Sequence, residues 1–368
     1  MILEGQTAYY SKYMILTDYP NTKYIYDYPS CNKSSKSVSF GTSYNTVEDN
    51  NGQIYHIKDS YLYKDDEQVL SVTTSNLIKT PLYYDSKTDT YWIGLENVRN
   101  FYLQNSVNSY DTSITRHILA SKGESFLNFA IQENKAYLVY IEKDDPVANI
   151  IYYTKDENVK LTRQNGIQLS TIGVSGEVTD MAVLEDGTVA VLVNEKSLNT
   201  ANQFTLTDGC TVNSRGALVL LSSDLSTYEV YGWTDSPRTI SAKLNSGSDD
   251  PYNGAPGNSQ IASITAYIPE YAGRNSHFYG PMRIVAIRPK ELVIADCGAN
   301  FVLPDYNEKK NGKMFTHNRL MTVNLRNFAI DCKKEFSEDE LKFQNLTISG
   351  NLEYVTAGWT KLSAENEK

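Results

Sequence analysis

Residues 280–325 constrain the fold most, because they hold a hairpin pattern that recurs along the chain. Two apolar runs, 284–287 and 292–296, flank a short polar turn, and an irregular stretch leads to a third apolar run. The same order of run, turn and run is found at 45–57, 82–93, 130–139, 182–192 and 346–355. Asn-Gly, Asp-Gly and Gly-Asn stand at three of these turns, and such dipeptides suit two-residue hairpins. A recurring hairpin predicts a repeat fold of six units.

A second hairpin follows the first in five of the units. Its opening run ends in Asp or Asn, whose side chains bond the backbone two residues further on and so close turns. These residues are Asp65, Asn105, Asp156, Asp224 and Asn324. Another run rich in β-prone residues follows each of them, so each unit is expected to form four antiparallel strands.

The unit at 346–355 lacks a second hairpin, and the N-terminal region supplies one. Residues 13–16 form an apolar run that ends near Asp18, and residues 23–26 form the next run. Four-stranded units completed by the opposite chain end are typical of a β-propeller closed by its termini. We therefore predict an all-β fold, a six-bladed β-propeller of four-stranded antiparallel blades whose last blade combines N- and C-terminal strands.

This fold is expected to occupy residues 1–368 as a single β-propeller domain. Unbroken apolar runs at 181–183, 189–193 and 292–295 favour it, because strands covered on both faces lose their alternation of polar and apolar residues. Two β-sandwiches with coincidental hairpins are the less favoured alternative, since they leave the complementary chain ends unexplained. A count of five or seven blades stays open.

The amino-acid composition limits the possible binding partners and the cellular location of the protein. The 28 tyrosines favour strands over helices. The net charge of −10 and the absence of a basic run argue against nucleic acid, which needs a concentrated basic surface. No apolar stretch is long enough for a transmembrane segment. The opening residues MILEGQTAYY lack the pattern of a signal peptide, and a removed leader or lipid anchor is left open.

One unit resembles a known family of repeats. Residues 280–286 read Gly-Pro-Met-Arg-Ile-Val-Ala, a Leu-Val-Ile-Ala-Asp run follows at 292–296, and Asn-Arg-Leu opens the third run at 318–320. This order resembles the NHL-type repeat of six-bladed propellers, and residues 179–194 match it in part. A long insertion after 292–296 departs from the repeat. The resemblance implies a six-bladed propeller, in a group that includes ligand-binding modules, lactonase-like hydrolases and lyases.

Three long insertions are predicted on one face of the propeller, at 194–215, 234–280 and 297–318. Two of them join second to third strands and one joins a fourth strand to the next first strand, so all three emerge on the same side. Long loops of this kind are usually functional or disordered. We expect them to form a cap over the channel mouth that binds the ligand, and lineage-specific decoration is the alternative.

The predicted ligand-binding residues are aromatic and basic side chains near this cap. They are Trp233, Tyr271, Arg274, His277, Tyr279 and His317. Tyr and Trp rings stack on sugar rings, and Arg holds a carboxylate through paired hydrogen bonds. Ordinary packing within loops is the competing interpretation. None of the four histidines lies at HxH or HxxxH spacing, so no local metal motif is encoded.

Asp180 and Asp296 are the candidate metal ligands. The NHL-like resemblance implies this role, since carboxylates at channel mouths hold divalent metals in lactonase-like propellers. The alternative is that each Asp closes a turn at a strand end.

The four cysteines do not form a CxxC pair, so a zinc ribbon or a thioredoxin-type motif is unsupported. An even number permits two disulfides, and we take Cys210 with Cys297 and Cys31 with Cys332 as the hypothetical pairs. Free buried thiols are an equally good interpretation.

Two functions compete for this sequence. The first is a non-catalytic, extracytoplasmic binding or interaction propeller (periplasmic, at the cell surface or secreted) that presents its insertion-built face to a protein or glycan and needs no cofactor. The one-sided insertions and the absence of a recognisable catalytic motif favour it. The alternative is a lactonase-like, metal-dependent hydrolase or lyase, with its site at the channel mouth and calcium as the metal. The sequence favours the non-catalytic function over an enzyme. Measuring the metal content of the purified protein would distinguish the two functions.

Overall fold

The computed structural model is an all-β chain. It describes residues 11–18, 21–41, 45–72, 76–97, 100–105, 115–118, 125–142, 145–155, 161–174, 176–196, 213–232, 237–245, 262–267, 278, 280–302, 313–337, 339–341 and 351–354. These residues contain one short 3-10 turn, η1 (Leu169–Ile172), and no α-helix. Within the same ranges no helix is long and apolar enough to cross a membrane.

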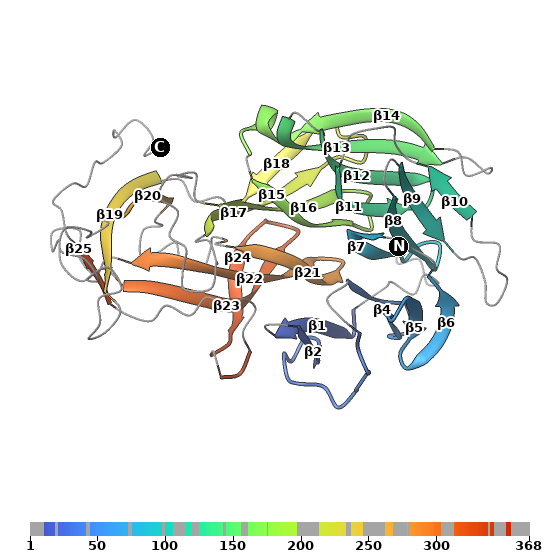
Figure 1. Cartoon of the computed structure of the whole chain (residues 1–368), viewed down its shortest axis with the longest axis horizontal. Coiled ribbons are helices and arrows are strands. Elements are labelled where there is room, and N and C mark those ends of the chain that lie inside the picture. Colours follow the sequence, from blue (N-terminus) through green and yellow to red (C-terminus); the bar gives the residue numbers. More distant parts are fainter. Residues whose placement is uncertain are drawn as a thin grey trace.

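Five antiparallel sheets of four consecutive strands account for most of the structure (Figure 1). The first contains β3 (Thr46–Glu48), β4 (Ile54–Lys58), β5 (Tyr61–Lys64) and β6 (Glu67–Ser71). The second contains β7 (Asn76–Asp85), β8 (Thr90–Asn97), β9 (Asn100–Asn105) and β10 (Thr115–Ile118). The third contains β11 (Ser125–Gln132), β12 (Lys135–Glu142), β13 (Asp145–Lys155) and β14 (Leu161–Gln168). The fourth contains β15 (Glu177–Val183), β16 (Val189–Lys196), β17 (Asn213–Leu221) and β18 (Tyr228–Tyr231). The fifth contains β21 (Pro281–Arg288), β22 (Glu291–Val302), β23 (Lys313–Asn324) and β24 (Ile330–Glu335).

The turns whose residue types predicted these sheets have the backbone angles that such turns require. Gly52 and Gly187 have φ angles of 81° and 88°, in the left-handed region that glycine enters without strain. Asp65 closes the turn after β5 with a φ of 49°, as expected of an Asx residue. The prediction of four antiparallel strands is therefore confirmed for five of the units.

Strand β16 shows how neighbouring sheets cover each other. Val189, Val191 and Val193 pack into one hydrophobic cluster with residues of β11, β12 and β15. The alternating residues Ala190 and Leu192 pack into a different cluster with β22 and β23. All five side chains are fully buried, which explains the unbroken apolar run in the sequence.

Hydrogen bonds join the opening strands of adjacent sheets. We call β3, β7, β11, β15 and β21 the first strands. The N-terminal hairpin of β1 (Tyr13–Asp18) and β2 (Thr22–Asp27) lies beside β21. Bonds crossing the boundaries are Asn45 Nδ2 to Leu82 O (3.1 Å), Glu133 N to Asp85 Oδ2 (2.6 Å), Gln132 Nε2 to Leu184 O (2.9 Å), Ile284 N to Asp180 Oδ2 (2.8 Å), Ile287 N to Ser11 Oγ (3.2 Å) and Lys12 N to Glu48 Oε1 (2.9 Å). The hairpin therefore bridges the fifth sheet and the first.

Among the described residues, the C-terminal strand does not belong to the sheet of the N-terminal hairpin, so the predicted pairing of the chain ends is not confirmed. Strand β25 (Asn351–Tyr354) pairs with β19 (Pro237–Asn245), which also pairs with β20 (Ala262–Tyr267). Figure 1 shows this three-stranded sheet on the left, away from β1 and β2. The β19–β20 hairpin offers an open edge, and an added strand satisfies its free N–H and C=O groups.

The predicted insertions also contain more regular structure than expected. The 234–280 insertion holds β19 and β20, and β16 and β17 extend into 194–215 as far as Lys196 and from Asn213. In 297–318, β22 and β23 stay paired residue for residue up to Val302 and Lys313. Continued pairing satisfies backbone groups that a loop would leave to water. The irregular loop predicted at 297–318 is thus largely an extended hairpin.

Gly232 follows β18 and packs tightly against Phe278, so we expect its replacement to destabilise the protein. Its φ is 77°, and a Cβ there would lie 2.2 Å from Cδ2 of the fully buried Phe278. We expect Gly232→Ala to lower the free energy of unfolding by more than about 2 kcal/mol, through backbone strain and steric overlap together.

Gly173→Ala is the matched control for this prediction. Gly173 has a similar φ of 75°, and a Cβ added there would have nothing within 4 Å, so it carries the backbone cost alone. Denaturant unfolding of both variants should show the larger loss for Gly232→Ala. Equal losses would contradict the packing role of Phe278.

Candidate functional site: the central cavity

A cavity of about 1680 Å³ runs along the first strands. Residues of β1, β3, β7, β11, β15 and β21 all line it. We call the end where the first strands begin the start mouth, and the end where they enter their hairpin turns the turn mouth. Ser11 and Lys12, just before β1, bond to Ile287 and Glu48 at the ends of β21 and β3. Strand β1 therefore begins at the turn mouth and runs opposite to the first strands.

The start mouth contains two basic side chains from distant parts of the sequence. Lys23 of β2 and Arg283 of β21 both line the cavity. Arg283 donates a hydrogen bond to Asn45 Oδ1 and lies 3.8 Å from Asp180 Oδ1. Burial and the charge of Arg283 lower the pKa of Lys23 to about 8. The positive charge of Arg283 is therefore one of the two causes that favour the neutral form of Lys23 at this mouth.

Asp180 belongs to β15 and lines the cavity at the start mouth, and its role as a metal ligand stays a prediction. Its oxygens accept hydrogen bonds from the backbone N–H groups of Ile284 (2.8 Å) and Met181 (2.9 Å). Burial raises the pKa of Asp180, and the neighbouring Arg283 opposes that rise. These contacts make Asp180 a connection between β15 and β21 rather than a turn-closing residue.

Asp296 is fully buried within the fifth sheet, and it is not among the cavity-lining residues. Its Oδ2 accepts a hydrogen bond from Arg319 Nε and forms an ion pair with Arg319 Nη2, both at 2.8 Å, and its Oδ1 accepts a hydrogen bond from Gly280 N (2.8 Å). The structure therefore does not bring the two candidate metal ligands to one place. Within the described ranges, no three His, Cys, Asp or Glu side chains gather as a metal site.

Most of the predicted ligand-binding residues fall outside the described residues. These are Trp233, Tyr271, Arg274, His277 and Tyr279. His317 belongs to β23, where it pairs with Gly298 of β22 in the extended hairpin. Their role in binding stays a prediction.

The hypothetical disulfide between Cys31 and Cys332 is not formed. Both are free thiols, and they pack into different hydrophobic clusters, which take alternate side chains of β22 and β23. Burial raises the pKa of each thiol. Cys210 lies outside the described residues, and Cys297 lies in β22.

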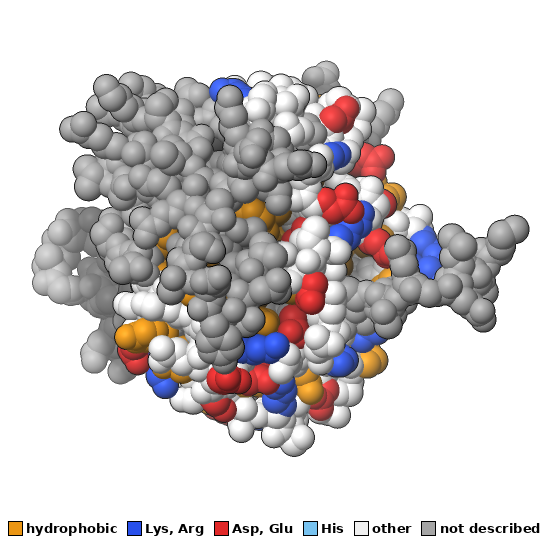
Figure 2. Space-filling view, turned by 90° about the vertical axis from the view of Figure 1, so that its right-hand side faces the viewer, with side chains coloured by type: hydrophobic (Ala, Val, Ile, Leu, Met, Phe, Trp, Pro, Cys, Tyr) orange, Lys and Arg blue, Asp and Glu red, His pale blue; other side chains and the backbone are white. Residues whose placement is uncertain are grey.

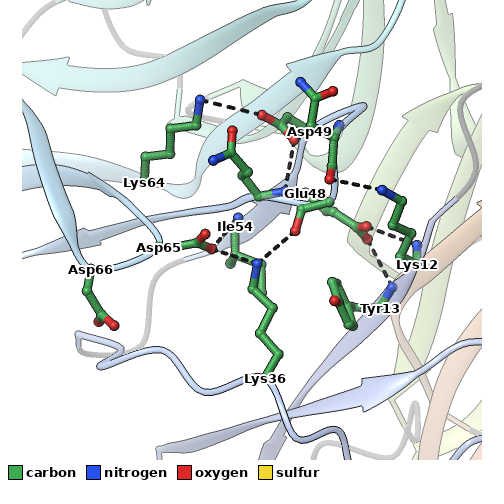
Figure 3. Close-up of polar contacts among 12 residues, drawn as sticks. Lys12, Tyr13, Lys36, Glu48, Asp49, Ile54, Lys64, Asp65 and Asp66 are labelled. Atoms are coloured by element: carbon green, nitrogen blue, oxygen red, sulfur yellow. Dashed lines mark hydrogen bonds and ion pairs between the residues drawn. The ribbon is translucent and has the colours of Figure 1, made fainter.

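Glu48 at the turn mouth is a site residue that the sequence did not reveal. Its carboxylate accepts hydrogen bonds from the backbone N–H groups of Lys12 (2.9 Å) and Tyr13 (3.2 Å), as Figure 3 shows. Burial raises its pKa to about 7, although these N–H groups oppose the rise. Glu48 therefore combines a structural bond to β1 with a carboxyl group that titrates near neutral pH.

Polar contacts around Glu48 hold the first sheet together. Asp49 accepts hydrogen bonds from the backbone N–H groups of Asn51 (2.8 Å) and Gln53 (2.9 Å), and Lys64 lies 4.0 Å from it. Asp65 bonds Ile54 N (2.9 Å) and pairs with Lys36 at 3.0 Å (Figure 3). Each carboxylate in this network closes a turn or links strands.

Polar residues at the ends of the first strands carry a signal that the sequence could have provided. Glu48, Asp85 and Gln132 each occupy the last position of a first strand, and each bonds a neighbouring sheet or hairpin. Aligning the units on this position would have marked Glu48. Lys23 has no such pattern, because only the folded hairpin brings it to Arg283.

Charge is unevenly distributed along the cavity wall. The acidic lining residues are Glu48, Asp85, Glu133, Glu177, Asp180, Glu185, Asp186 and Glu229, and the basic ones are Lys23, Lys87, Arg283 and Arg288. Only Glu177 and Asp180 of the acidic set belong to the start mouth, so the turn mouth is acidic and the start mouth is balanced. On the outer face in Figure 2, acidic and basic side chains of the described residues are interspersed without a continuous basic patch.

Comparison with known proteins finds similarity in structure alone. No family model and no curated protein matches the chain. A luciferin-regenerating enzyme has 11% sequence identity, over 96% of this chain and 80% of that chain, with a TM-score of 0.31. A protein from Lactobacillus plantarum has 8% identity, over 94% of this chain and 99% of that chain, with a TM-score of 0.41. The account of the fold therefore rests on the sheets themselves.

Proposed function

We propose that this chain is a non-catalytic binding protein, a six-membered propeller of the NHL-like type whose ligand enters the central cavity. Five four-stranded sheets supply five members, and the β1–β2 hairpin occupies the sixth place. The hydrogen bonds from Ile287 to Ser11 and from Lys12 to Glu48 support closure, because they join the hairpin to both neighbours. In this proposal the N-terminal hairpin alone closes the ring, without the C-terminal strand.

The observation that carries this function is the use of the cavity carboxylates. Asp180 and Glu48 accept backbone N–H bonds from adjacent elements, and Asp85 accepts Glu133 N (2.6 Å) and Thr88 Oγ1 (2.7 Å). A general acid, a general base or a metal ligand needs an oxygen that can reach the substrate or the ion. Carboxylates that connect sheets form a rigid wall around a space, which suits binding.

A metal-dependent hydrolase or lyase is the second candidate, and the acidic turn mouth favours it. An excess of carboxylates with few basic partners attracts divalent cations such as calcium. Stoichiometric calcium or zinc in the purified protein, together with turnover of a lactone or glycoside, would favour this candidate over binding alone.

The proposal also includes a cellular location and a class of binding partner. An extracytoplasmic location and a protein or carbohydrate ligand suit a propeller whose strand extensions and β19–β20 hairpin leave the start-mouth side. His317 lies in the paired extension of β22 and β23 on this same side, so the ligand would contact both the cavity and this face.

A screen of the full chain against immobilised oligosaccharides and peptides tests the proposal. Thr46→Trp places a large ring on the half-buried start of β3, and we expect it to weaken binding by narrowing the cavity at the start mouth. Thr162→Trp makes the same change on the exposed outer strand β14 and should bind normally. Binding by the folded Thr46→Trp variant as tight as that of the wild type would contradict a cavity ligand.

A further inference from the structure

His56 is a buried titratable residue in strand β4 of the first sheet, and it is 1% exposed. Its Nε2 lies 2.8 Å from the backbone oxygen of Asp65. A carbonyl oxygen only accepts hydrogen bonds, so Nε2 carries the hydrogen and Nδ1 is the unprotonated nitrogen of the neutral ring. Nδ1 is buried and has no hydrogen-bond partner within the described part of the chain. Protonation would therefore create a buried N–H group without an acceptor, which destabilises this arrangement.

Two aromatic rings enclose the imidazole. Tyr63 of β5 stacks on it, with ring centroids 5.4 Å apart and planes 18° apart. Phe40 meets it edge to face, also with centroids 5.4 Å apart. Rings in these positions keep water away from a neutral imidazole and do not solvate a charged one.

The charges around the imidazole come from several elements. Lys23 of β2 and Lys58 of β4 are positive, and Asp66, which follows β5, is negative. Burial lowers the pKa of His56, and the two lysines add to this effect. The hydrogen bond to Asp65 O and the charge of Asp66 oppose it. The surrounding groups therefore favour the neutral ring.

Phe40 belongs to residues 37–41, which form no helix or strand and precede the first sheet in the chain. We call them the 37–41 segment. It lies directly on β4, because a Cβ added to Gly41 would be 2.6 Å from both Ile57 O and Lys58 Cβ. Close contact with β4 places this segment over the strand that carries His56.

Side chains, and not strand pairing, attach this segment to the sheet. Ser39 N donates to Asp66 Oδ1 (2.8 Å), and Ser39 Oγ accepts from Lys58 Nζ (3.2 Å). Strand β4, in contrast, pairs with β3 on one side and β5 on the other. Parts of a fold with few buried contacts open most readily, so the segment should open before the strand does.

We propose that the 37–41 segment is released by acid: a proton added at Nδ1 of His56 displaces Phe40, so that water can accept a hydrogen bond from the new N–H group. The released state takes up the proton at the ordinary pKa of 6.5, whereas the closed state resists it. The closed state is therefore favoured above pH 6.5 and loses stability as the pH falls below that value. This conformational switch is independent of the proposed ligand.

Hydrogen exchange of the full chain at pH 7.5, 6.5 and 5.5 tests the proposal. Ser39 N and Phe40 N both donate hydrogen bonds, so their protection reports closure of the segment. Their protection factors, corrected for the pH dependence of free amides, should fall below pH 6.5. The limit set by one proton is about tenfold per pH unit. The amides of β16 should keep their protection.

His56→Gln retains a donor for Asp65 O but cannot take up the proton, so it should lose the acid response. Phe40→Ala changes only the segment and should still fold. By removing the ring that covers the imidazole, it should raise the pKa of His56 towards 6.5, as measured by NMR of the histidine ring. Phe328→Ala is the matched control, because Phe328 stacks on Tyr231 at 4.5 Å in another part of the fold. It should leave the titration of His56 unchanged.

Several results would overturn the proposal. They are protection of Ser39 and Phe40 that does not change between pH 7.5 and pH 5.5, an acid response that His56→Gln retains, or the same His56 titration in Phe40→Ala and the wild type. Loss of protection in β16 over the same pH range would show that the whole protein unfolds, and it would equally refute a local release.

Discussion

Asp296→Ala is expected to lower the free energy of unfolding by about 3–5 kcal/mol, because it leaves the Arg319 guanidinium buried without its partner. The two side chains are 0% and 1% exposed and 2.8 Å apart. Gly280 N also loses its acceptor. Urea unfolding followed by tyrosine fluorescence measures the loss, and a change of less than about 1 kcal/mol would show that the pair is dispensable.

A double replacement provides the control. Arg319→Met alone should also destabilise the protein, because Asp296 then becomes the unpaired buried charge. The combination of Arg319→Met with Asp296→Leu should cost less than the sum of the single changes, since neither charge remains. If Asp296 instead served as a metal ligand, a chelator would reproduce the effect of Asp296→Ala in the wild-type protein.

Glu48→Gln is expected to change the pH dependence of stability. The pKa of Glu48 is near 7 in the folded protein and near the ordinary value of 4.5 when unfolded, so between these values the folded state binds more protons. Wild-type stability should therefore fall as pH rises from 4.5 to 7, by about 3 kcal/mol from this residue. The glutamine side chain cannot ionise, so the variant should gain stability relative to wild type between pH 5 and pH 8.

Unfolding curves at pH 5 and pH 8 measure this difference. Burial also raises the pKa of Asp180, so only the difference between variant and wild type is assigned to Glu48. Glu67→Gln, at an exposed position of β6, is the matched control and should follow the wild-type curve. Parallel curves for Glu48→Gln and the wild type would contradict the shifted pKa.

The sequence predicted the sheets well because their signals are local. Asn51-Gly52 and Asp186-Gly187 mark turns whose geometry depends on adjacent residues alone. The unbroken apolar run 189–193 indicated that both faces of this strand are buried. Its alternate side chains pack into two separate hydrophobic clusters. Patterns of this kind need no knowledge of the partner strand.

The features that the sequence did not predict concern contacts between distant segments. Strand β25 pairs with β19 through backbone groups, which every residue carries, so side chains could not indicate the choice of edge. Glu48 binds backbone N–H groups that lie 35 and 36 residues earlier in the chain. Lys23 and Arg283 line the same cavity because the N-terminal hairpin lies beside β21, and Asp296 pairs with an arginine of its own sheet.

The burial of β16 on both faces affects how the protein unfolds. In a linear array, a terminal repeat can melt while its neighbours persist, because each interface is lost one at a time. Here one strand supplies alternate side chains to two interfaces, so disrupting it exposes apolar surface on both sides at once. The fourth sheet thereby couples the melting of the third and the fifth, and these sheets should protect their amide hydrogens from exchange as one cooperative block.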